Sequence, residues 1–502
     1  MEVVKKKDPR EVALLADEAA RFAGSLAGRK AYNAPKGPAT YILTSAQNNT
    51  QVHEGLWENL LVYAKYLKAT LYVSQFTYNT NAYQAREVKP GTRVAEYDEV
   101  WYDSNLAPYV YNERLNLTPS LTFCGELNIL PTADRPLNGF ENYTNRASGI
   151  FPHARQHMQS IASLDSPKFN YTTGACTLRN YIQKRAGLRA EHHHAYGALI
   201  VRVDGNGDWF VRQLRATEDG SFYDVARDGA LLVRGGKITR RHRVEAYQPG
   251  DVHVAQMDPS IRELTWGKGG IVDTLKPRYQ FLHDTLDFKS RNHHEQKDAH
   301  ELFRKHVRKQ DSVEAELKDV ARFLKDTAAR PDCQLVVVDS NHDQALTRWL
   351  REAELASDPI NALVYLDLQR EVYRAIAEGK DDFHLLETVM RQMGVSDRVR
   401  FLRVDESFVI CRLAGGIECG MHGDRGANGA RGTPSMFAKV GRRASTGHVH
   451  AACIIDDLFV AGTCSLLRLS YNRGLSGWSH SGVLTYANGC RTIITCWKGR
   501  WN

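Results

Sequence analysis

The feature that most constrains the fold of this chain is an apolar run that ends abruptly at a group of polar residues. Residues 335–338 (LVVV) are rich in β-branched side chains, which predicts a short buried strand. The next five residues read Asp-Ser-Asn-His-Asp, and an amphipathic helix pattern follows them. A turn from a strand into a helix needs only one capping side chain. The presence of Asn341, His342 and Asp343 together therefore indicates a chemical site at the end of this strand.

Strand and helix patterns alternate along the first half of the chain, which predicts an α/β fold. Residues 41–45 (YILTS) and 70–74 (TLYVS) have the composition of strands, and the apolar residues of 56–67 fall on one helical face between them. That order is a βαβ unit. Residues 115–180 are rich in Pro, Asn and Thr and predict a loop-rich segment, whereas 198–214 predicts two strands joined by a turn.

The length of 502 residues predicts two domains, because a single core rarely grows so large. The chain becomes basic and turn-like near RGGK at 234–237. We place the boundary there, between an N-terminal α/β domain (1–236) and a C-terminal domain (237–502). Helix patterns at 313–324 and 363–376 lie between further strand patterns in the second half. No internal repeat is detectable.

Composition excludes several classes of protein. With 42% hydrophobic and 25% charged residues, and no apolar run of about 20 residues, the chain is predicted to be soluble and not membrane-bound. The start has a basic patch without an apolar signal core, so we expect an amphipathic N-terminal helix and a cytoplasmic protein. The nine cysteines include no C-x-x-C pair, which favours reduced thiols. The net charge of +8 permits a polyanionic partner without requiring one.

Residues that can bind metals gather at predicted strand ends in the second half. Loops at the carboxyl ends of strands converge on one crevice in an open α/β sheet, so separate segments can supply one site. Imidazole favours Mn, Fe, Zn or Ni, and the oxygen ligands keep the site hard enough for Mn. We therefore predict two divalent ions, Mn being favoured over Mg, Fe, Zn and Ni. The candidate ligands are Asp251, His253, Asp284, Asn341, His422, His448 and His450.

The order of these motifs resembles the signature of the calcineurin-like metallophosphoesterases over residues 251–450. The motifs are D-x-H, an Asp-containing second motif, N-H-D, a single His, and G-H-x-H. The resemblance implies a four-layer α/β/β/α sandwich and hydrolysis of a phosphoester. It also implies one metal bound by Asp251, His253 and His450, a second bound by Asn341, His422 and His448, and Asp284 bridging both. His342 would be the general acid or transition-state donor, oriented by Asp343.

Three positions depart from that signature. His283 and Ser340 stand where the family usually has Gly before the second-motif Asp and the third-motif Asn. Asp287 stands where the purple acid phosphatase branch has a Tyr ligand, so no iron-tyrosinate chemistry is expected. Every expected ligand is nevertheless present. The adjacent residues 192–194 (HHH) and 293–294 (HH) predict a loop or strand entry and a helix start rather than metal sites.

Basic side chains near the predicted ligands match a nucleic-acid backbone, although they also suit an ordinary solvated surface. The candidates for substrate binding are Arg425, Arg431, Arg442 and Arg443. The segments 122–143 (TFCGELNILPTADRPLNGFENY) and 470–482 (SYNRGLSGWSHSG) also resemble phage-encoded proteins that degrade host DNA early in infection.

These resemblances imply a Mn-dependent nuclease that hydrolyses phosphodiester bonds of DNA in the host cytoplasm. The N-terminal domain would serve in DNA binding, in homo-oligomerisation, or in binding a host or phage protein. One alternative is a phosphatase or cyclic-nucleotide phosphodiesterase that acts on small molecules. Another is a non-catalytic interaction protein that binds metal.

Overall fold

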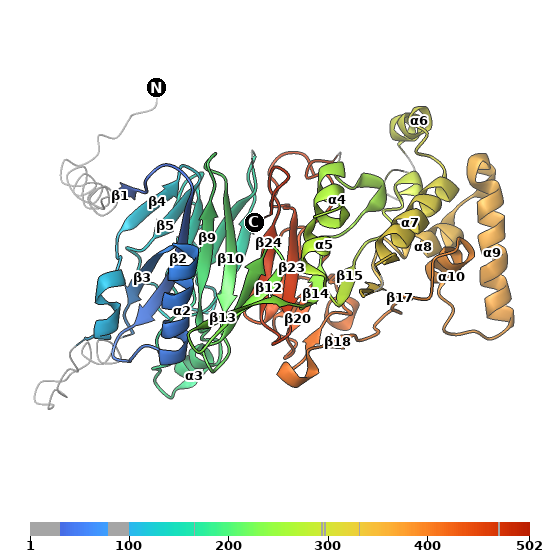
Figure 1. The fold of residues 1–502 in the computed structure, drawn as a ribbon. Coiled ribbons are helices and arrows are strands. Elements are labelled where there is room, and N and C mark those ends of the chain that lie inside the picture. Colours follow the sequence, from blue (N-terminus) through green and yellow to red (C-terminus); the bar gives the residue numbers. More distant parts are fainter. Residues whose placement is uncertain are drawn as a thin grey trace, which may run out of the picture.

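The computed structural model has a mixed α/β fold built on several β-sheets (Figure 1). It describes residues 31–78, 100–164, 166–292, 295, 298–330, 332–469 and 472–501. The predicted N-terminal amphipathic helix and the pair His293–His294 lie outside these residues. No helix in the described part of the chain has the length and apolar character needed to cross a membrane.

The predicted βαβ unit is confirmed as β2 (Ala39–Gln47), α2 (Glu54–Leu67) and β3 (Thr70–Phe76), with the two strands parallel. α2 begins after His53, whose Nδ1 accepts a hydrogen bond from the backbone N–H of Leu56. This bond satisfies one of the donors that a first helical turn leaves unpaired. The predicted hairpin is β9 (Gly197–Val203) and β10 (Trp209–Arg215), which completes a four-stranded sheet in the order β10-β9-β2-β3.

The segment predicted to be rich in loops consists mostly of loops and turns, and it also contributes five short strands to an 11-stranded sheet. Strands of four or five residues are too short to show a clear alternation, and the Pro- and Asn-rich turns between them dominate the composition. The first part of the sheet consists of β1 (Ala31–Asn33), β4 (Arg114–Thr118), β5 (Leu121–Cys124), β6 (Ser148–Phe151), β8 (Lys168–Thr172) and β7 (Met158–Ile161). Its second part consists of β21 (Cys453–Ile455), β22 (Leu458–Val460), β20 (Ala444–Thr446), β19 (Ile417–Glu418) and β18 (Val409–Ile410).

The two parts of this sheet repeat one topology, so the interpretation that the chain contains no internal repeat is wrong. The orders β4-β5-β6-β8-β7 and β18-β19-β20-β22-β21 match, and neighbours pair antiparallel, parallel, parallel and antiparallel in both. The repeat is one of strand order and is not evident in the sequence. The short similarity between 174–178 (GACTL) and 462–466 (GTCSL) is too brief to indicate a repeat. β7 pairs antiparallel with β21, so the two halves point in opposite directions.

The second half also contains a six-stranded sheet in the order β17-β16-β15-β14-β23-β24. The first four strands are parallel, and the last two add antiparallel to β14. The predicted strand before the Asn-His-Asp motif is confirmed as β16. The bounds are β14 (Val244–Gln248), β15 (Tyr279–Leu282), β16 (Gln334–Val337), β17 (Val399–Phe401), β23 (Ser481–Tyr486) and β24 (Arg491–Thr495).

Helices cover one face of the six-stranded sheet (Figure 1). The predicted stripe at 313–324 lies on α7 (Val313–Ala328), where Leu317, Val320 and Leu324 are fully buried against the sheet. The predicted helix at 363–376 is α9 (Ala362–Ala377). The other helices of this half are α4 (Pro259–Trp266), α5 (Ile271–Leu275), α6 (Ala299–Val307), α8 (Ala345–Glu352), α10 (Leu385–Gln392) and α11 (Pro434–Phe437).

One apolar core joins the two halves of the chain. It contains residues of β2, β9, β23 and β24 on one side and of β5, β8, β21 and β22 on the other. The four-stranded sheet and the six-stranded sheet therefore both pack on the 11-stranded sheet. The predicted boundary at 236/237 lies in the turn between β12 (Gly229–Arg234) and β13 (Lys237–His242), two paired strands of a small sheet that also contains β11 (Phe222–Ala226). The division into two domains and the four-layer order stay predictions.

Candidate metal centre

The candidate ligands come from loops at one edge of the second half. Asp251 and His253 follow β14, Asp284 follows β15, and Asn341 follows β16. These three strands are adjacent and parallel, so their carboxyl ends meet at the same edge. His422 lies in the loop after β19, and the segment 448–450 joins β20 to β21 in the facing sheet. The fold thus brings together residues as far apart in the chain as His253 and His450, which are separated by 197 positions, and Asp251, which lies two positions earlier.

Four side chains form a buried cluster that matches the first predicted metal site. One ligand atom from each of Asp251, His253, Asp284 and His450 lies within 4.8 Å of the others. His450 Nε2 lies 3.1 Å from Asp251 Oδ2 and 3.0 Å from His253 Nε2. His253 Nε2 lies 3.5 Å from Asp284 Oδ2. Two imidazoles and two carboxylates therefore converge on one point, which is a donor set that suits a divalent transition metal.

The remaining candidates gather on the other side of Asp284. His422 Nε2 lies 3.4 Å from Asp284 Oδ2 and 3.1 Å from Asn341 Oδ1. The ring centroids of His422 and His448 are 5.2 Å apart. Asp284 consequently lies between two groups of ligands, in the position that a bridging carboxylate would occupy. The assignment of each residue to one of two metals stays a prediction.

Buried atoms without partners show that these residues fit a cation. Asp251 Oδ1, both carboxylate oxygens of Asp284, and His450 Nδ1 are buried and have no hydrogen-bond partner among the described residues. A buried charge without compensation is strongly unfavourable, and a bound cation would remove that penalty. Burial raises the pKa of Asp251, and the charge of Asp284 raises it further. Burial lowers the pKa of His450 to about 4, so its imidazole is neutral and its lone pair is free to bind.

The ligand loops have unusual backbone conformations that the sequence did not reveal. His253, Asp284, His448 and His450 have φ between 47° and 75°, in the left-handed region that side-chain-bearing residues rarely adopt. Each such residue costs on the order of 1–3 kcal/mol, and this strain is typical of functional sites. A Cβ atom on Gly447 would lie 2.1 Å from Asp251 Oδ1, so glycine is required there.

Asp287 contacts the candidate ligand His253, although the sequence analysis assigned it no role. Its Oδ1 lies 2.9 Å from His253 Nδ1, and Gln256 donates a hydrogen bond to its Oδ2. A carboxylate that accepts the Nδ1–H of a histidine directs the Nε2 lone pair of that ring toward a metal. The available signal was the replacement of the Tyr of the purple acid phosphatase branch by a second carboxylate.

His342 lies at the mouth of this cluster and is one-quarter exposed. Its Nδ1 lies 3.1 Å from the main-chain oxygen of Asp287, and its ring contacts that of His253. Burial alone would lower the pKa of His342, but the charges of Asp284 and Asp287 outweigh it and raise the pKa to about 9. In the metal-free protein these charges therefore favour the protonated ring.

Asp343 does not orient His342 as expected, because its carboxylate accepts hydrogen bonds from other residues. Among the described residues they come from Thr285, Leu286 and Ser340, not from His342. Asp343 thus ties the loop after β16 to the loop after β15, because its side chain points back into the protein. Ser340, one of the departures from the family signature, donates one of these bonds. The other departure, His283, is buried with its Nδ1 3.2 Å from His422 Nδ1.

The four candidate substrate-binding arginines have different surroundings. Arg425 and Arg442 line a cavity of about 270 Å³ that also reaches the ligand His422. Arg431 is exposed and pairs through its backbone with Arg425. Arg443 instead donates hydrogen bonds to the carbonyl oxygens of Ala414 and Gly489. The first two therefore lie nearest the ligands, in a cavity that is also lined by the carboxylates Asp339, Asp405, Glu406, Glu418 and Asp424.

The triple histidine at 192–194 lies where α3 (Arg185–His192) ends and the loop into β9 begins, so the expected loop or strand entry is confirmed for His193 and His194 but not for His192. His192 is the last residue of α3, and His193 caps the end of that helix. His194 is buried with its Nδ1 2.9 Å from the hydroxyl oxygen of Tyr181. The three rings point into different surroundings because they lie at the end of a helix.

Comparison with known proteins gives one informative relative. Protein A1 of Escherichia phage T5 is 39% identical over 477 residues, which cover 92% of this chain and 82% of that protein. The chain matches no protein-family model and no solved structure. The aligned region includes nearly the whole chain, so the similarity concerns both halves of the fold.

Proposed function

This chain belongs to the family of Protein A1 of Escherichia phage T5, and we propose that it is a phage-encoded metallophosphoesterase that hydrolyses DNA. The observation that carries the proposal is the buried pair of ligand groups that share Asp284. Structural ion pairs satisfy their own charges, whereas both oxygens of Asp284 are left without a hydrogen-bond partner among the described residues. The centre would act in the cytoplasm of the infected host.

Two divalent ions bound at this centre, with Mn favoured, would supply the positive charge that neutralises phosphodiester oxygens and lowers the pKa of a bound water molecule. Asp251, His253 and His450 would hold one ion, and Asn341, His422 and His448 would hold the other. Asp284 would touch both. Asp287 would keep His253 in the tautomer whose Nε2 faces the cluster, because it accepts the proton of Nδ1.

His342 would supply the proton that the leaving oxygen needs. The charge of Asp287, which is not one of the proposed ligands, favours the protonated ring, and the partial exposure of His342 places it where a substrate can approach. Nδ1 faces the main-chain oxygen of Asp287, so Nε2 is the nitrogen available to a leaving oxygen. This geometry supports the role that the family resemblance implies for His342.

Two further observations support the four-layer fold and the nucleic-acid substrate of the proposal. Helices pack on the six-stranded sheet, and that sheet packs on the 11-stranded sheet, with α11 on the far side of β20 and β22. This order supports a four-layer sandwich. Arg425 and Arg442, beside His422, would contact phosphates of an extended backbone in place of their present partners Asp424 and Glu418.

The test is cleavage of supercoiled plasmid by the full-length protein in Mn, with and without a chelator. We expect loss of the supercoiled form only with metal. His342→Ala should slow cleavage by about 10²–10⁴-fold without loss of bound metal. Asp284→Ala should abolish cleavage and also reduce the metal content, because it removes the shared ligand.

The alternatives give different results in the same assay. Hydrolysis of bis-p-nitrophenyl phosphate or nucleotides with plasmid left intact would indicate the small-molecule phosphatase or cyclic-nucleotide phosphodiesterase. Bound metal with no turnover of either substrate would indicate the non-catalytic interaction protein. Full activity in both variants would refute the assignment of the site.

A further inference from the structure

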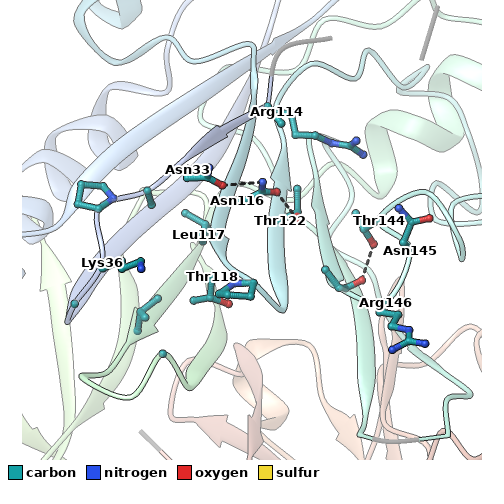
Figure 2. A pocket seen from close by; sticks show the side chains of 18 of the residues that line it. Asn33, Lys36, Arg114, Asn116, Leu117, Thr118, Thr122, Thr144, Asn145 and Arg146 are labelled. Carbon is teal, nitrogen blue, oxygen red and sulfur yellow. Dashed lines mark hydrogen bonds between the residues drawn. The ribbon is translucent and has the colours of Figure 1, made fainter. Parts of the chain in front are cut away.

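A large groove lies in the N-terminal half, away from the metal ligands. It has a volume of about 920 Å³ and lies over the ends of β1, β4 and β9 (Figure 2). Lys36, Arg114 and Arg146 line it, and no carboxylate does so among the described residues. Its other polar walls are amides and hydroxyls, among them Asn116 and Thr122, which are joined by a hydrogen bond. The groove is therefore a positively charged surface with many hydrogen-bonding groups.

The three cations of the groove differ in their contacts with the other described residues. Arg114 is held by Glu126 and packs on the ring of Tyr143, so its position is fixed. Lys36 and Arg146 are exposed, and neither has a carboxylate within ion-pair distance among the described residues. Such side chains are suited to contact phosphates that follow one another along a strand.

A second cavity shares Arg146 with this groove. It has a volume of about 240 Å³, and Phe169, Trp209 and Trp497 form aromatic walls. Its one carboxylate, Asp208, is neutralised by Lys498 and Arg500. Aromatic walls beside a basic groove are the combination that binds unpaired bases of a single strand, because bases stack on the rings while cations contact the backbone.

Both cavities lie on the same side of the molecule as the metal ligands. The antiparallel pairing of β7 with β21 reverses one half relative to the other, so the amino end of β2 lies on the side of the carboxyl end of β14. Figure 1 shows β1 and α4 on the same upper side. The second cavity is also lined by Ser479 and His480, and Trp478 of the same segment packs on the ligand His450 at 4.2 Å between centroids.

We propose that the basic groove and the aromatic cavity together bind a single-stranded part of the nucleic acid that the metal centre cleaves. This inference rests on the proposed function for the identity of the substrate, but the binding it describes does not require cleavage. The strand would leave the metal centre past Trp478, place bases against Trp209 and Trp497, and continue over Arg146 to Lys36. The N-terminal half would thus be a substrate-binding module.

The test is binding of a fluorescein-labelled single-stranded oligonucleotide to the full-length protein in chelator, followed by anisotropy. The variant Lys36→Glu/Arg146→Glu should bind at least about tenfold more weakly, with a shallower dependence of affinity on salt. The matched control is Arg322→Glu/Arg398→Glu, which makes the same charge change at exposed positions of the second half. The control should bind like the wild type.

Stacking is tested separately with an oligonucleotide that contains 2-aminopurine, whose fluorescence falls when the base stacks. Binding to the wild type should quench this fluorescence, and Trp497→Ala should reduce the quenching. Equal affinity of the groove and control variants would overturn the proposal, as would the absence of any binding by the wild type. Hydrolysis of bis-p-nitrophenyl phosphate by the wild type reports on the metal centre alone. Absence of Mn-dependent plasmid cleavage by the wild type, with groove-dependent binding intact, would refute the proposed function and leave this inference standing.

Discussion

At the scale of single residues, the most informative side chain is Asp287, which no family motif designates. It contacts His253 through its carboxylate and His342 through its main-chain oxygen, so one residue holds both a ligand and the proposed acid. The consequence is that metal binding and proton delivery depend on the same short loop after β15. A change at this position should therefore affect metal affinity even though Asp287 is not a predicted ligand.

We expect Asp287→Ala to weaken Mn binding by about 10–100-fold, because His253 loses the acceptor that fixes its tautomer and ring orientation. Isothermal titration of the metal-free protein with Mn measures this change. Asp287→Asn should retain more affinity, since its amide oxygen can still accept the Nδ1–H. The control is Asp397→Ala, at a fully exposed carboxylate. Unchanged affinity in Asp287→Ala would show that His253 is positioned by other contacts.

The identity of the candidate ligands could be predicted from the sequence, whereas their geometry could not. Asp251, Asp284 and Asn341 were placed by the rule that loops after adjacent parallel strands converge, which needs only strand positions. The error over Asp343 arose because adjacent residues in a tight turn point in different directions, which depends on φ and ψ. The left-handed conformation of Asp284 is likewise set by tertiary packing and has no signal in the residue type.

At the scale of elements, the turn between β21 and β22 connects the two halves through Asp456. Its Oδ1 lies 3.1 Å from Arg155 and 2.9 Å from His157 Nε2, both of which belong to the N-terminal half. His193 lies 3.6 Å away. Because β21 directly follows the loop with His448 and His450, this contact fixes the strand that carries two of the candidate ligands.

We expect Asp456→Asn to lower the free energy of unfolding by about 1–3 kcal/mol at pH 7, since it removes a charge-assisted contact of buried groups. Burial would raise the pKa of Asp456, but His157, His193 and Arg155 lower it below its usual value. The stabilisation is therefore complete above the unfolded pKa of about 4 and is lost as the pH falls below it. Urea unfolding of both proteins at pH 7 and pH 3 should show the difference shrinking in acid. A constant difference would show that the charge of Asp456 is not responsible.

Long elements with a strong periodicity could be predicted, and short ones could not. α7 and β2 were identified because many residues contribute to their patterns. By contrast, β5 and β6 have four residues each and are stabilised by neighbours on both sides. Their sequence alone does not distinguish them from loops, because the sheet partners that stabilise them come from distant parts of the chain.

At the scale of the whole molecule, the N-terminal half repeats the strand order of the second half but lacks its candidate metal ligands. Ser45 pairs with Ala175 in the first half as Asp251 pairs with Thr463 in the second, so a hydroxyl stands where the second half has a carboxylate. Arg155 and His157 of the first half instead bind Asp456. The first half thus contributes its sheet, its basic groove and an anchor for β21.

This arrangement predicts that residues 237–502 do not form a stable soluble protein by themselves. Their separation would expose the edge of β21, which normally pairs with β7, and the apolar faces of Ile454, Phe459 and Ile493 in the shared core. Unpaired strand edges with apolar faces drive aggregation. We expect the fragment to elute as an aggregate in size-exclusion chromatography and to bind an apolar dye strongly, whereas the full chain elutes as a defined species. A monodisperse fragment with Mn-dependent hydrolysis of bis-p-nitrophenyl phosphate would instead establish 237–502 as an independent domain, and the first half would then act on the substrate alone.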